Sequence, residues 1–539
     1  MKALLAGVNA KYIHTSLSVR TIASYVNGID WKEYNINESA EFVCADIYRQ
    51  RTDAVLFSCY IWNIEFILKT ARRLKSVAPD TLIIFGGPEV SYADTEYMEK
   101  YDFIDAVIRG EGEETVKEFI RTGNLNIRGV TYRNGKIIKN PDRPVISDIT
   151  KIPFPYTDED IELNKNKLIY YETSRGCPFN CSYCLSSADR SVRFRDLDTV
   201  LNELKFFINH KVKIVKFTDR TFNASKKRTH AILEFLIDNA AETTFHFEVA
   251  ADILDDKTME LLGSAPKGLF QLEIGVQSTN MKTLEAIDRK TDLNKIAERV
   301  RQIRSFGNIH THLDLIAGLP YENYESFKNS FNEVFAMQPH VIQLGFLKLL
   351  RGTKIRREEQ SALFTAEPPY EVLQTDYISY DELLRLKAVE DVVEKYYNSG
   401  AFENSVSYLV RQFNSPFEMF EKIACFYEKN GYDKIGISRD FLYRILFDFV
   451  NDEKFTDILL YDYLLNNKPR TPEWASRKPV IKERFEILTP EFIEKELPEY
   501  SQMTVKEIIK RLYFERFFNP ERILIFDNAH DRVIQKFLS

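Results

Sequence analysis

The strongest constraint on the fold is a regular alternation, from the first residue onward, of short apolar runs with stretches of helical periodicity. Such alternation is typical of βα units and of a parallel sheet covered by helices. In the first part of the chain five runs qualify as strands: residues 2–8, 32–36, 54–58, 82–85 and 106–108. They predict an α/β domain with a doubly wound, flavodoxin-like sheet of five strands.

A second series of βα units follows, with six candidate strands: residues 168–172, 214–218, 245–250, 270–275, 311–316 and 341–345. Six units in so short a stretch predict an open, partial (β/α)6 barrel rather than a closed barrel of eight. After residue 355 the pattern is mostly helical, with helix candidates at 380–397, 416–429 and 439–451. We therefore expect a mostly α-helical C-terminal domain.

A proline-rich stretch between the two series sets the expected domain boundaries. Four prolines and few periodic apolar residues lie between Pro141 and Asp160, which is typical of a linker. The predicted organisation is a first domain at 1–140, a linker at 141–165, a barrel at 166–355 and a C-terminal domain at 356–539. A chain of 539 residues is too long for one ordinary core, which agrees with this division.

Composition narrows the class of protein. No window approaches the roughly 18 uninterrupted apolar residues that a membrane span needs, so we expect no span. The net charge of -7 argues against a large nucleic-acid-binding surface. The one feature that favours such a surface is the set of basic residues scattered from Lys468 to Arg484. Six cysteines are too few for a disulfide scaffold in so long a chain, which predicts a reducing, cytoplasmic location.

Three of the cysteines lie within eight residues, in a loop just beyond a predicted strand: Cys177, Cys181 and Cys184. At this C-x3-C-x2-C spacing three thiolates can each hold one iron of a cubane cluster, which leaves the fourth iron without a protein ligand. Gly176 and Pro178 favour a tight turn in which the thiols converge, and Tyr183 is placed to form an aromatic wall beside the cluster. The motif predicts an iron-sulfur site with one open, reactive iron.

The alternatives to an iron-sulfur site are a structural zinc site and a chance cluster of buried cysteines; the polar, turn-forming residues that flank the three cysteines argue against the second. A structural zinc site needs four ligands, and although a distant histidine could supply the fourth, the sequence has no second C-x2-C and no His pair at finger spacing. The other cysteines, Cys44, Cys59 and Cys425, lie in apolar stretches, and we interpret them as small core residues.

The cysteine motif after a barrel's first strand resembles the hallmark of the radical S-adenosylmethionine (SAM) superfamily. The resemblance continues at 215–222, which is similar to the second-strand segment that meets the methionyl amine and contains Thr218 and Asp219. Residues 247–252, 273–278 and 313–320 are similar to the third, fourth and fifth strand motifs of the branch that includes oxygen-independent coproporphyrinogen dehydrogenase. The resemblance therefore covers most of the predicted barrel.

The resemblance implies a role for four polar residues. Glu248 would hold the SAM ribose, Gln277 and Arg289 the amino acid end, and Asp314 would make a further polar contact. A ribose diol suits a carboxylate acceptor, and a carboxylate suits the guanidinium fork. Taken singly, each of these residues could instead be a satisfied buried polar group.

The resemblance also implies a chemistry and its partners. A 4Fe-4S cluster would cleave SAM reductively to give a 5'-deoxyadenosyl radical, with the protein supplying position, electrostatics and exclusion of water. Such a cluster is destroyed by oxygen, so a reduced cytoplasm and an electron donor such as flavodoxin or ferredoxin are implied.

In the first domain, glycines follow two neighbouring predicted strands. The two loops comprise Gly86, Gly87, Pro88, Glu89, Val90 and Ser91, and Gly110, Glu111 and Gly112. Ligands of doubly wound sheets lie at these carboxyl ends, where glycines let the backbone approach closely. G-x-G-x-x-G and the Walker lysine are absent, which excludes a dinucleotide or P-loop fingerprint.

Together the two loops resemble those of the cobalamin-binding domain that precedes many radical SAM barrels. Four further residues follow predicted strands and are expected to line the same face, against the corrin ring: Asn9, Ser58, Tyr60 and Trp62. The D-x-H-x-x-G motif of proteins that ligate cobalt with histidine is missing, which suggests cobalamin without a protein histidine on its lower face. We interpret His14 as a loop histidine.

Two alternatives remain for the first domain. The glycines could be turn residues of a degenerate domain that only packs on the barrel. The methylthiotransferase group carries a second cluster on three N-terminal cysteines, but here only Cys44 and Cys59 precede the barrel.

These features predict a cobalamin-dependent radical SAM enzyme that methylates an unactivated carbon of an unknown small-molecule or peptide substrate. One alternative is a cobalamin-dependent rearrangement or cyclisation without methyl transfer. Another is a SAM or cobalamin sensor without catalysis, and a nucleic-acid-modifying role is the least supported. The C-terminal domain resembles an uncharacterised helical extension found after some of these barrels.

Overall fold

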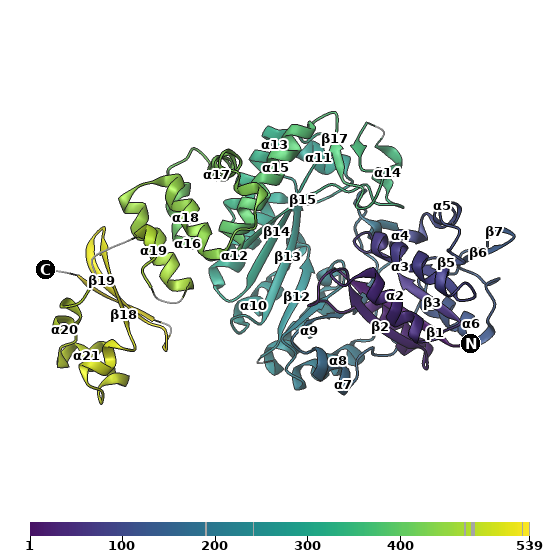
Figure 1. Ribbon diagram of the computed structural model, residues 1–539, viewed down its shortest axis with the longest axis horizontal. Helices are drawn as coiled ribbons and strands as arrows, with labels where there is room; N and C mark the ends of the chain where they lie inside the picture. The colour runs from purple at the N-terminus through teal and green to yellow at the C-terminus, as the bar shows by residue number, and fades with distance from the viewer. Residues whose placement is uncertain are drawn as a thin grey trace. The chain divides into compact units, whose positions relative to one another are not determined.

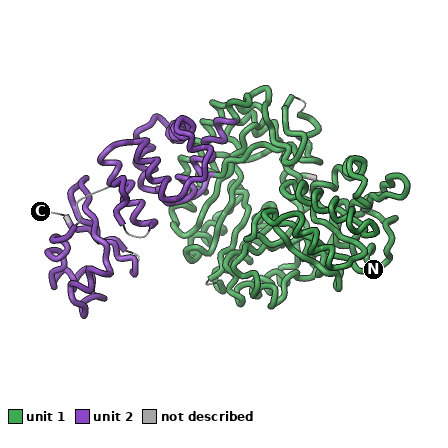
Figure 2. Tube along the Cα trace, in the orientation of Figure 1, with its two compact units in different colours: residues 1–339, 343–383 green, residues 340–342, 384–539 purple. Residues whose placement is uncertain are grey.

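The computed structural model describes residues 1–188, 191–240, 242–359, 361–467, 470–475, 480–530 and 532–537. The chain forms two compact units, one of residues 1–339 and 343–383 and the other of residues 340–342 and 384–539 (Figure 2). Of the basic stretch from Lys468 to Arg484, residues 468, 469 and 476–479 lie outside the described residues. No helix in the described ranges is long and apolar enough to cross a membrane.

Five parallel strands form the centre of the first domain's sheet: β1 (Ala3–Asn9), β2 (Asp30–Asn35), β3 (Ala54–Ser58), β4 (Leu82–Gly86) and β5 (Ala106–Ile108). Their order, β2-β1-β3-β4-β5, confirms the doubly wound, flavodoxin-like prediction (Figure 1). Except for the polar edge strand β2, the strands are nearly continuous apolar runs because both faces of the sheet are buried.

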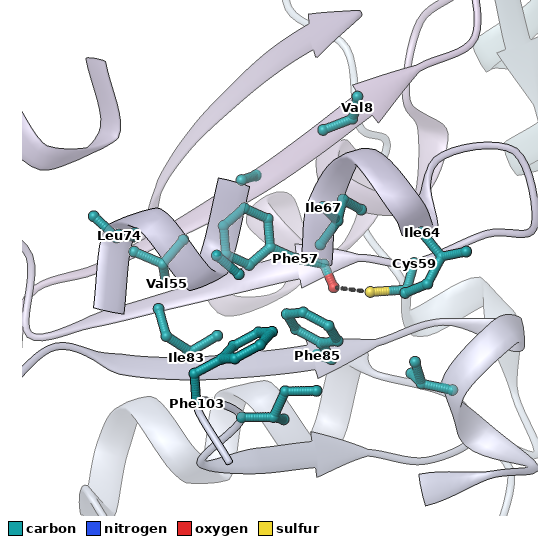
Figure 3. Packing of buried hydrophobic residues seen from close by; sticks show 14 of the residues in the cluster. Val8, Val55, Phe57, Cys59, Ile64, Ile67, Leu74, Ile83, Phe85 and Phe103 are labelled. Atoms are coloured by element: carbon teal, nitrogen blue, oxygen red, sulfur yellow. Dashed lines mark hydrogen bonds between the residues drawn. The ribbon is translucent and has the colours of Figure 1, made fainter. Parts of the chain in front are cut away.

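Helices cover both faces of this sheet. One face packs against α2 (Ala40–Arg49) and α3 (Ile64–Val77), and the other against α1 (Leu17–Val26) and α6 (Glu113–Thr122). On the first face, Phe57 and Phe85 meet edge to face with ring centroids 5.8 Å apart (Figure 3). Burial of side chains of this size contributes roughly 1.5–3 kcal/mol each.

The sheet has two more strands than the five predicted. A hairpin of β6 (Val130–Asn134) and β7 (Lys136–Lys139) extends the β5 edge with antiparallel pairing. Its turn is Asn134-Gly135, with Gly135 at φ 67°, a conformation that glycine adopts without strain. The strands were overlooked because they are short and charged, as edge strands are.

The connecting segment at 141–165 is packed rather than free. It contains a short turn at Ile149–Lys151 and the helix α7 (Asp158–Asn164). Ile152 and Tyr156 are buried, and Asp160 forms an ion pair with the buried Arg20 of α1. This segment therefore ties the first domain to the barrel within one unit.

Six strands build the second sheet: β8 (Leu168–Tyr171), β11 (Ile214–Phe217), β12 (Thr244–Val249), β13 (Phe270–Gln277), β14 (His310–Ala317) and β15 (Val341–Phe346). They lie side by side in chain order, and the pairs from β8 to β14 are parallel, which confirms the open, partial barrel (Figure 1). Helices connect them: α8 (Leu197–Asn209), α9 (Lys226–Asn239), α10 (Asp256–Ser264), α11 (Met281–Ala286), α12 (Leu293–Phe306) and α13 (Tyr324–Phe335).

A loop of the first domain extends the barrel sheet at its β8 edge. His14 bridges to Leu168 in the parallel sense, and Leu168 N–H donates to Ile13 O at 2.8 Å. Thr15 Oγ1 donates to the carbonyl of Leu168 at 3.0 Å. The loop that follows β1 therefore faces both sheets.

In the second unit, three helices correspond to the predicted ones: α15 (Tyr380–Val393), which begins in the first unit, α17 (Pro416–Asn430) and α18 (Arg439–Val450). Cys425 is exposed on α17, so its assignment to the core is wrong. The helix buries its other face through Phe420, Ala424 and Tyr427. Cys44 and Cys59 are buried as predicted.

The C-terminal region also contains a sheet that the helical prediction lacked. Strands β18 (Tyr513–Phe518), β19 (Glu521–Asp527) and β20 (Arg532–Phe537) form an antiparallel meander. They pack with α21 (Pro490–Glu496) and α22 (Val505–Ile509) around a separate apolar core. Its signal was present as aromatic and β-branched runs on both sides of Asn519-Pro520.

Candidate functional site

A cleft of about 1190 Å³ opens where the loops after the first domain's strands meet the barrel. Sites for drug-sized ligands are typically about 300–1,000 Å³, so this one has room for more than one such molecule. Thirteen of the residues predicted to bind cofactors line it: Asn9, Ser58, Tyr60, Trp62, Gly86, Gly87, Pro88, Ser91, Gly110, Glu111, Gly112, Thr218 and Glu248.

The two glycine loops form part of the cleft wall with their backbone. Gly110, at φ 71°, has open space where a Cβ would point. Gly87, at φ 107°, lies so close to the next loop that a Cβ would stand 2.6 Å from Cys59 O. Ser91 joins the two loops, because its hydroxyl donates to Gly87 O at 2.8 Å and accepts from Gly110 N–H at 3.2 Å. Together they form a backbone cradle on the cleft wall.

An aromatic pair forms the wall next to the cradle. The rings of Tyr60 and Trp62 stack with centroids 4.3 Å apart and planes 13° from parallel. Trp62 keeps half of its surface exposed although it belongs to the cleft lining. A flat, half-exposed apolar surface beside open backbone suits a large planar ligand.

Glu89 and Val90 do not line the cleft, although both were predicted to contact a cofactor. Val90 is fully buried in the core of the first domain. Glu89 is 2% exposed and its Oε1 accepts hydrogen bonds from Tyr97 at 2.8 Å and from Tyr370. The short helix α4 (Pro88–Ser91) turns both side chains inward, away from the backbone that forms the cradle.

A charge network joins the cradle to the cysteine loop. Arg175 forms ion pairs with Glu172 at 2.9 Å, with Glu111 at 3.4 Å and with Glu113. Arg193 lies 2.8 Å from Glu111. Burial alone would raise the pKa of Glu111, but hydrogen bonds and the two guanidinium charges outweigh it and lower the pKa. Glu111 is therefore held as an anion beside the cleft.

The cysteine loop is anchored through Asp219 and Thr221, which follow β11. Asp219 accepts from Thr173 N–H at 2.7 Å, from the Thr173 hydroxyl at 2.5 Å and from the Ser174 hydroxyl at 2.7 Å. Asp219 is 2% exposed and does not line the cleft, so its carboxylate positions the cysteine loop through these bonds. Thr221 Oγ1 lies 3.5 Å from Cys177 Sγ.

The three thiols of the motif are free and not at zinc spacing. Tetrahedral zinc with bonds of about 2.3 Å would bring sulfur atoms within about 3.8 Å of one another. Among the described residues, three possible metal ligands have their ligand atoms within 4.8 Å of one another: Glu499, Asp527 and His530. The three thiols, which are free, do not form such a group. In the Glu499 group Arg532 already pairs with both carboxylates.

Arg289 and Gln277 meet beside Cys181. Arg289 Nη1 donates to Cys181 Sγ at 3.6 Å, and Nη2 donates to Gly275 O. Gln277, at φ 72°, folds its side chain back over Gly275, where a Cβ would stand 2.2 Å from its Nε2. Tyr183 lies against the same thiol and guanidinium, and burial raises its pKa. The structure thus gathers residues separated by more than a hundred positions at one thiol.

Some buried polar atoms in this part of the barrel have no hydrogen-bond partner. In the described chain, Gln277 Oε1, Asp314 Oδ1 and Ser182 Oγ are buried without a hydrogen-bond partner. Burial, and then the charges of Glu273 and Glu248, raise the pKa of Asp314 well above its usual range. Buried polar atoms are nearly always paired, so this set fits a polar ligand held next to the thiols.

The site also contains residues that the sequence did not single out. Arg175, Arg193, Arg220 and Lys216 all line the cleft. A signal existed for Arg175, which directly precedes the motif's glycine, and for Arg220, which follows Asp219 in the predicted second-strand segment. Lys216 lies in the same segment, whereas Arg193 had no local signal, because its partner Glu111 belongs to the other domain.

Family models match three stretches of the chain. A B12 binding domain matches residues 3–120 and the Radical SAM superfamily matches residues 171–334. The chain therefore carries a B12 binding domain followed by a radical SAM domain. A family of proteins of unknown function (DUF4080) matches residues 358–529.

Named relatives and a solved structure agree with this assignment. The chain is 28% identical over 322 residues to the cobalamin-dependent radical SAM methyltransferase TokK of Streptomyces tokunonensis, covering 55% of this chain and 47% of TokK. It is 25% identical over 311 residues to the anaerobic magnesium-protoporphyrin IX monomethyl ester cyclase of Cereibacter sphaeroides, covering 53% and 49%. The chain spans about half the length of these curated relatives.

The fold is shared with the radical SAM methyltransferase TsrM of Kitasatospora setae, solved with cobalamin and a 4Fe-4S cluster bound. The TM-score is 0.57 at 16% identity, over 69% of this chain and 82% of TsrM. The two matched domains imply a 4Fe-4S cluster, SAM and cobalamin as cofactors. The cradle and aromatic pair fit cobalamin, and the thiols with the unpaired polar atoms fit the cluster and SAM.

Proposed function

We propose that this protein is a cobalamin-dependent radical SAM methyltransferase acting on an unactivated carbon. The observation that carries the proposal is the shared cleft: the glycine loops of the B12 binding domain and Thr218 and Glu248 of the barrel line one cavity. When bound, the cluster supplies the electron that cleaves SAM, and cobalamin supplies a carrier for the methyl group. SAM and cobalamin can therefore act on one substrate within the same cavity.

The chain's residues have separate tasks in this proposal. Cys177, Cys181 and Cys184 bind the cluster. Arg289 and Gln277 hold the amino acid end of SAM, and the Arg289 charge favours the anionic form of the neighbouring thiol. Glu248 accepts hydrogen bonds from the ribose; burial raises its pKa, while the Arg220 charge opposes that shift. Asp219 acts through the cysteine loop as a positioning residue.

The charged side chains that line the cleft support a proposal for the charge of the substrate. Six of its cations have a carboxylate partner: Arg109, Lys139, Arg143, Arg175, Arg193 and Lys216. Arg220 has no such partner among the described residues, and its backbone is fixed between Asp219 and Thr221. We propose that the substrate is a small molecule with a carboxylate or phosphate that Arg220 binds.

The test uses extract from cells that lack the protein, incubated without oxygen with reconstituted enzyme, reductant and SAM labelled with deuterium on its methyl group. Mass spectrometry should find a product heavier by one labelled methyl group with wild-type protein and not with Cys177→Ala. Arg220→Gln should reduce that product about 10-fold or more, because a charged hydrogen bond is lost, while leaving SAM cleavage intact. A labelled product of equal yield in Arg220→Gln contradicts the anionic substrate.

Cyclisation without methyl transfer is the second candidate, favoured by the 25% identity to the magnesium-protoporphyrin cyclase. It predicts 5'-deoxyadenosine without S-adenosylhomocysteine. A sensor without catalysis predicts neither product under strong reductant. We further propose a cytoplasmic location and an electron donor of the flavodoxin or ferredoxin class, because an open cluster requires reducing surroundings.

A further inference from the structure

Glu89 is a buried acid at the base of the cobalamin cradle. It follows Gly87 and Pro88 directly and is 2% exposed. A buried carboxylate is costly unless it is fully bonded, and here two tyrosine hydroxyls, those of Tyr97 and Tyr370, donate to the same oxygen, Oε1. One of these donors, Tyr370, is 281 positions away in the chain.

Tyr370 is held in place by a second set of contacts. It is completely buried, and its hydroxyl accepts from Arg351 Nε at 2.8 Å while donating to Glu89. Arg351 also donates from Nη2 to Glu96 at 2.9 Å, on α5 (Asp94–Lys100) of the first domain. Because arginine can only donate, it leaves the Tyr370 hydroxyl hydrogen to donate to Glu89.

A close backbone contact lies beside this network. Gly352 has φ 88°, and a Cβ there would stand 2.5 Å from the ring of Tyr92. Tyr92 and the preceding Ser91 both line the cleft. The stretch after the last barrel strand therefore contacts residues 86–92, the cradle loop, at two points: Tyr370 meets Glu89, and Gly352 meets Tyr92.

We propose that Arg351, Gly352 and Tyr370 form a clamp that holds the cradle loop in the shape that binds cobalamin. Tyr370 belongs to the region that matches proteins of unknown function, at 358–529, outside the B12 binding match at 3–120 and the radical SAM match at 171–334. The clamp gives the beginning of that region a function. It rests on the proposed binding of cobalamin at this loop.

The experiment measures the affinity and the dissociation rate of hydroxocobalamin on the full-length protein with its cluster reconstituted. Tyr370→Phe removes one hydroxyl that donates to a carboxylate, so cobalamin should bind about 10-fold more weakly and leave correspondingly faster. Gly352→Ala should weaken binding by a similar factor, because both the positive φ and the Tyr92 ring oppose a side chain. SAM affinity and iron content should stay at the wild-type level in both variants.

Glu367→Gln is the matched control. It removes an exposed ion pair with Lys100, 3.2 Å long, between the same two parts of the chain, and should leave cobalamin affinity unchanged. Wild-type cobalamin affinity in both Tyr370→Phe and Gly352→Ala overturns the clamp, as does an equal loss of cobalamin, SAM and iron, which would mean general unfolding. Wild-type protein that binds SAM but no hydroxocobalamin overturns the proposed function and the clamp with it.

Discussion

Arg289 contacts the site through both arms of its guanidinium group. One arm donates to Cys181 Sγ at 3.6 Å and the other to the carbonyl of Gly275. Lysine keeps the charge but has no planar fork, so it cannot make both contacts and bind a carboxylate as well. Arg289→Lys should weaken SAM binding about 10-fold with the iron content unchanged, as measured by equilibrium dialysis of the reconstituted protein. Loss of iron with SAM affinity intact would assign Arg289 to the cluster alone.

Glu322 gives the protein a pH-dependent stability. It is completely buried, and its Oε1 accepts from Ser278 at 2.7 Å and from Ser330 at 2.9 Å, while burial raises its pKa to about 7. Below about pH 4.5 the carboxyl is protonated in both folded and unfolded chains. Between there and about pH 7 only the unfolded chain ionises, so the free energy of unfolding falls as pH rises, by up to about 3 kcal/mol.

Glu322→Gln removes this dependence. The melting temperature of wild-type protein should decrease from pH 5 to pH 7 more steeply than that of the variant, and at pH 8 the variant should be the more stable. Thermal unfolding followed by circular dichroism measures both curves. Parallel curves for the two proteins would show that Glu322 ionises as easily in the folded chain as in the unfolded one.

At the scale of elements, the loop after β11 positions the cysteine loop. Asp219→Ala removes the acceptor of three hydrogen bonds to Thr173 and Ser174, so the cysteine loop should lose its fixed shape. The iron bound per chain after reconstitution should fall to less than half. Asp255→Ala is the control: it removes the cap of α10, which costs about 1 kcal/mol of stability, and leaves iron content unchanged. Full iron content in Asp219→Ala contradicts the positioning role.

The sequence predicted the elements whose signal is local. Most strands of the two sheets could be predicted from short apolar or alternating runs, and the motif at Cys177 could be predicted because its three cysteines are neighbours in the chain. The hairpin at β6 and β7 and the meander from β18 to β20 were missed, being short or set in a helical region. The burial of Glu89 could not be predicted from the sequence, because its contact with Tyr370 joins residues 281 positions apart.

At the scale of the whole molecule, the first domain and the barrel act as one unit. The loop after β1 adds to the barrel sheet, Arg175 pairs with acids of the first domain, and the clamp returns from beyond the barrel to the cradle. None of these contacts could be predicted from the sequence, since each joins residues that are distant in the chain and have no shared pattern. The cleft at this junction is lined by the glycine loops of the first domain and by Thr218 and Glu248 of the barrel.

The central claim is that this cleft uses SAM in two ways, and the direct test is a count of its two products. Reconstituted protein is incubated without oxygen with SAM and reductant, with and without hydroxocobalamin, and S-adenosylhomocysteine and 5'-deoxyadenosine are quantified by mass spectrometry. We predict both products with hydroxocobalamin, and 5'-deoxyadenosine alone without it. Formation of 5'-deoxyadenosine alone under both conditions, or of neither product, would contradict the account.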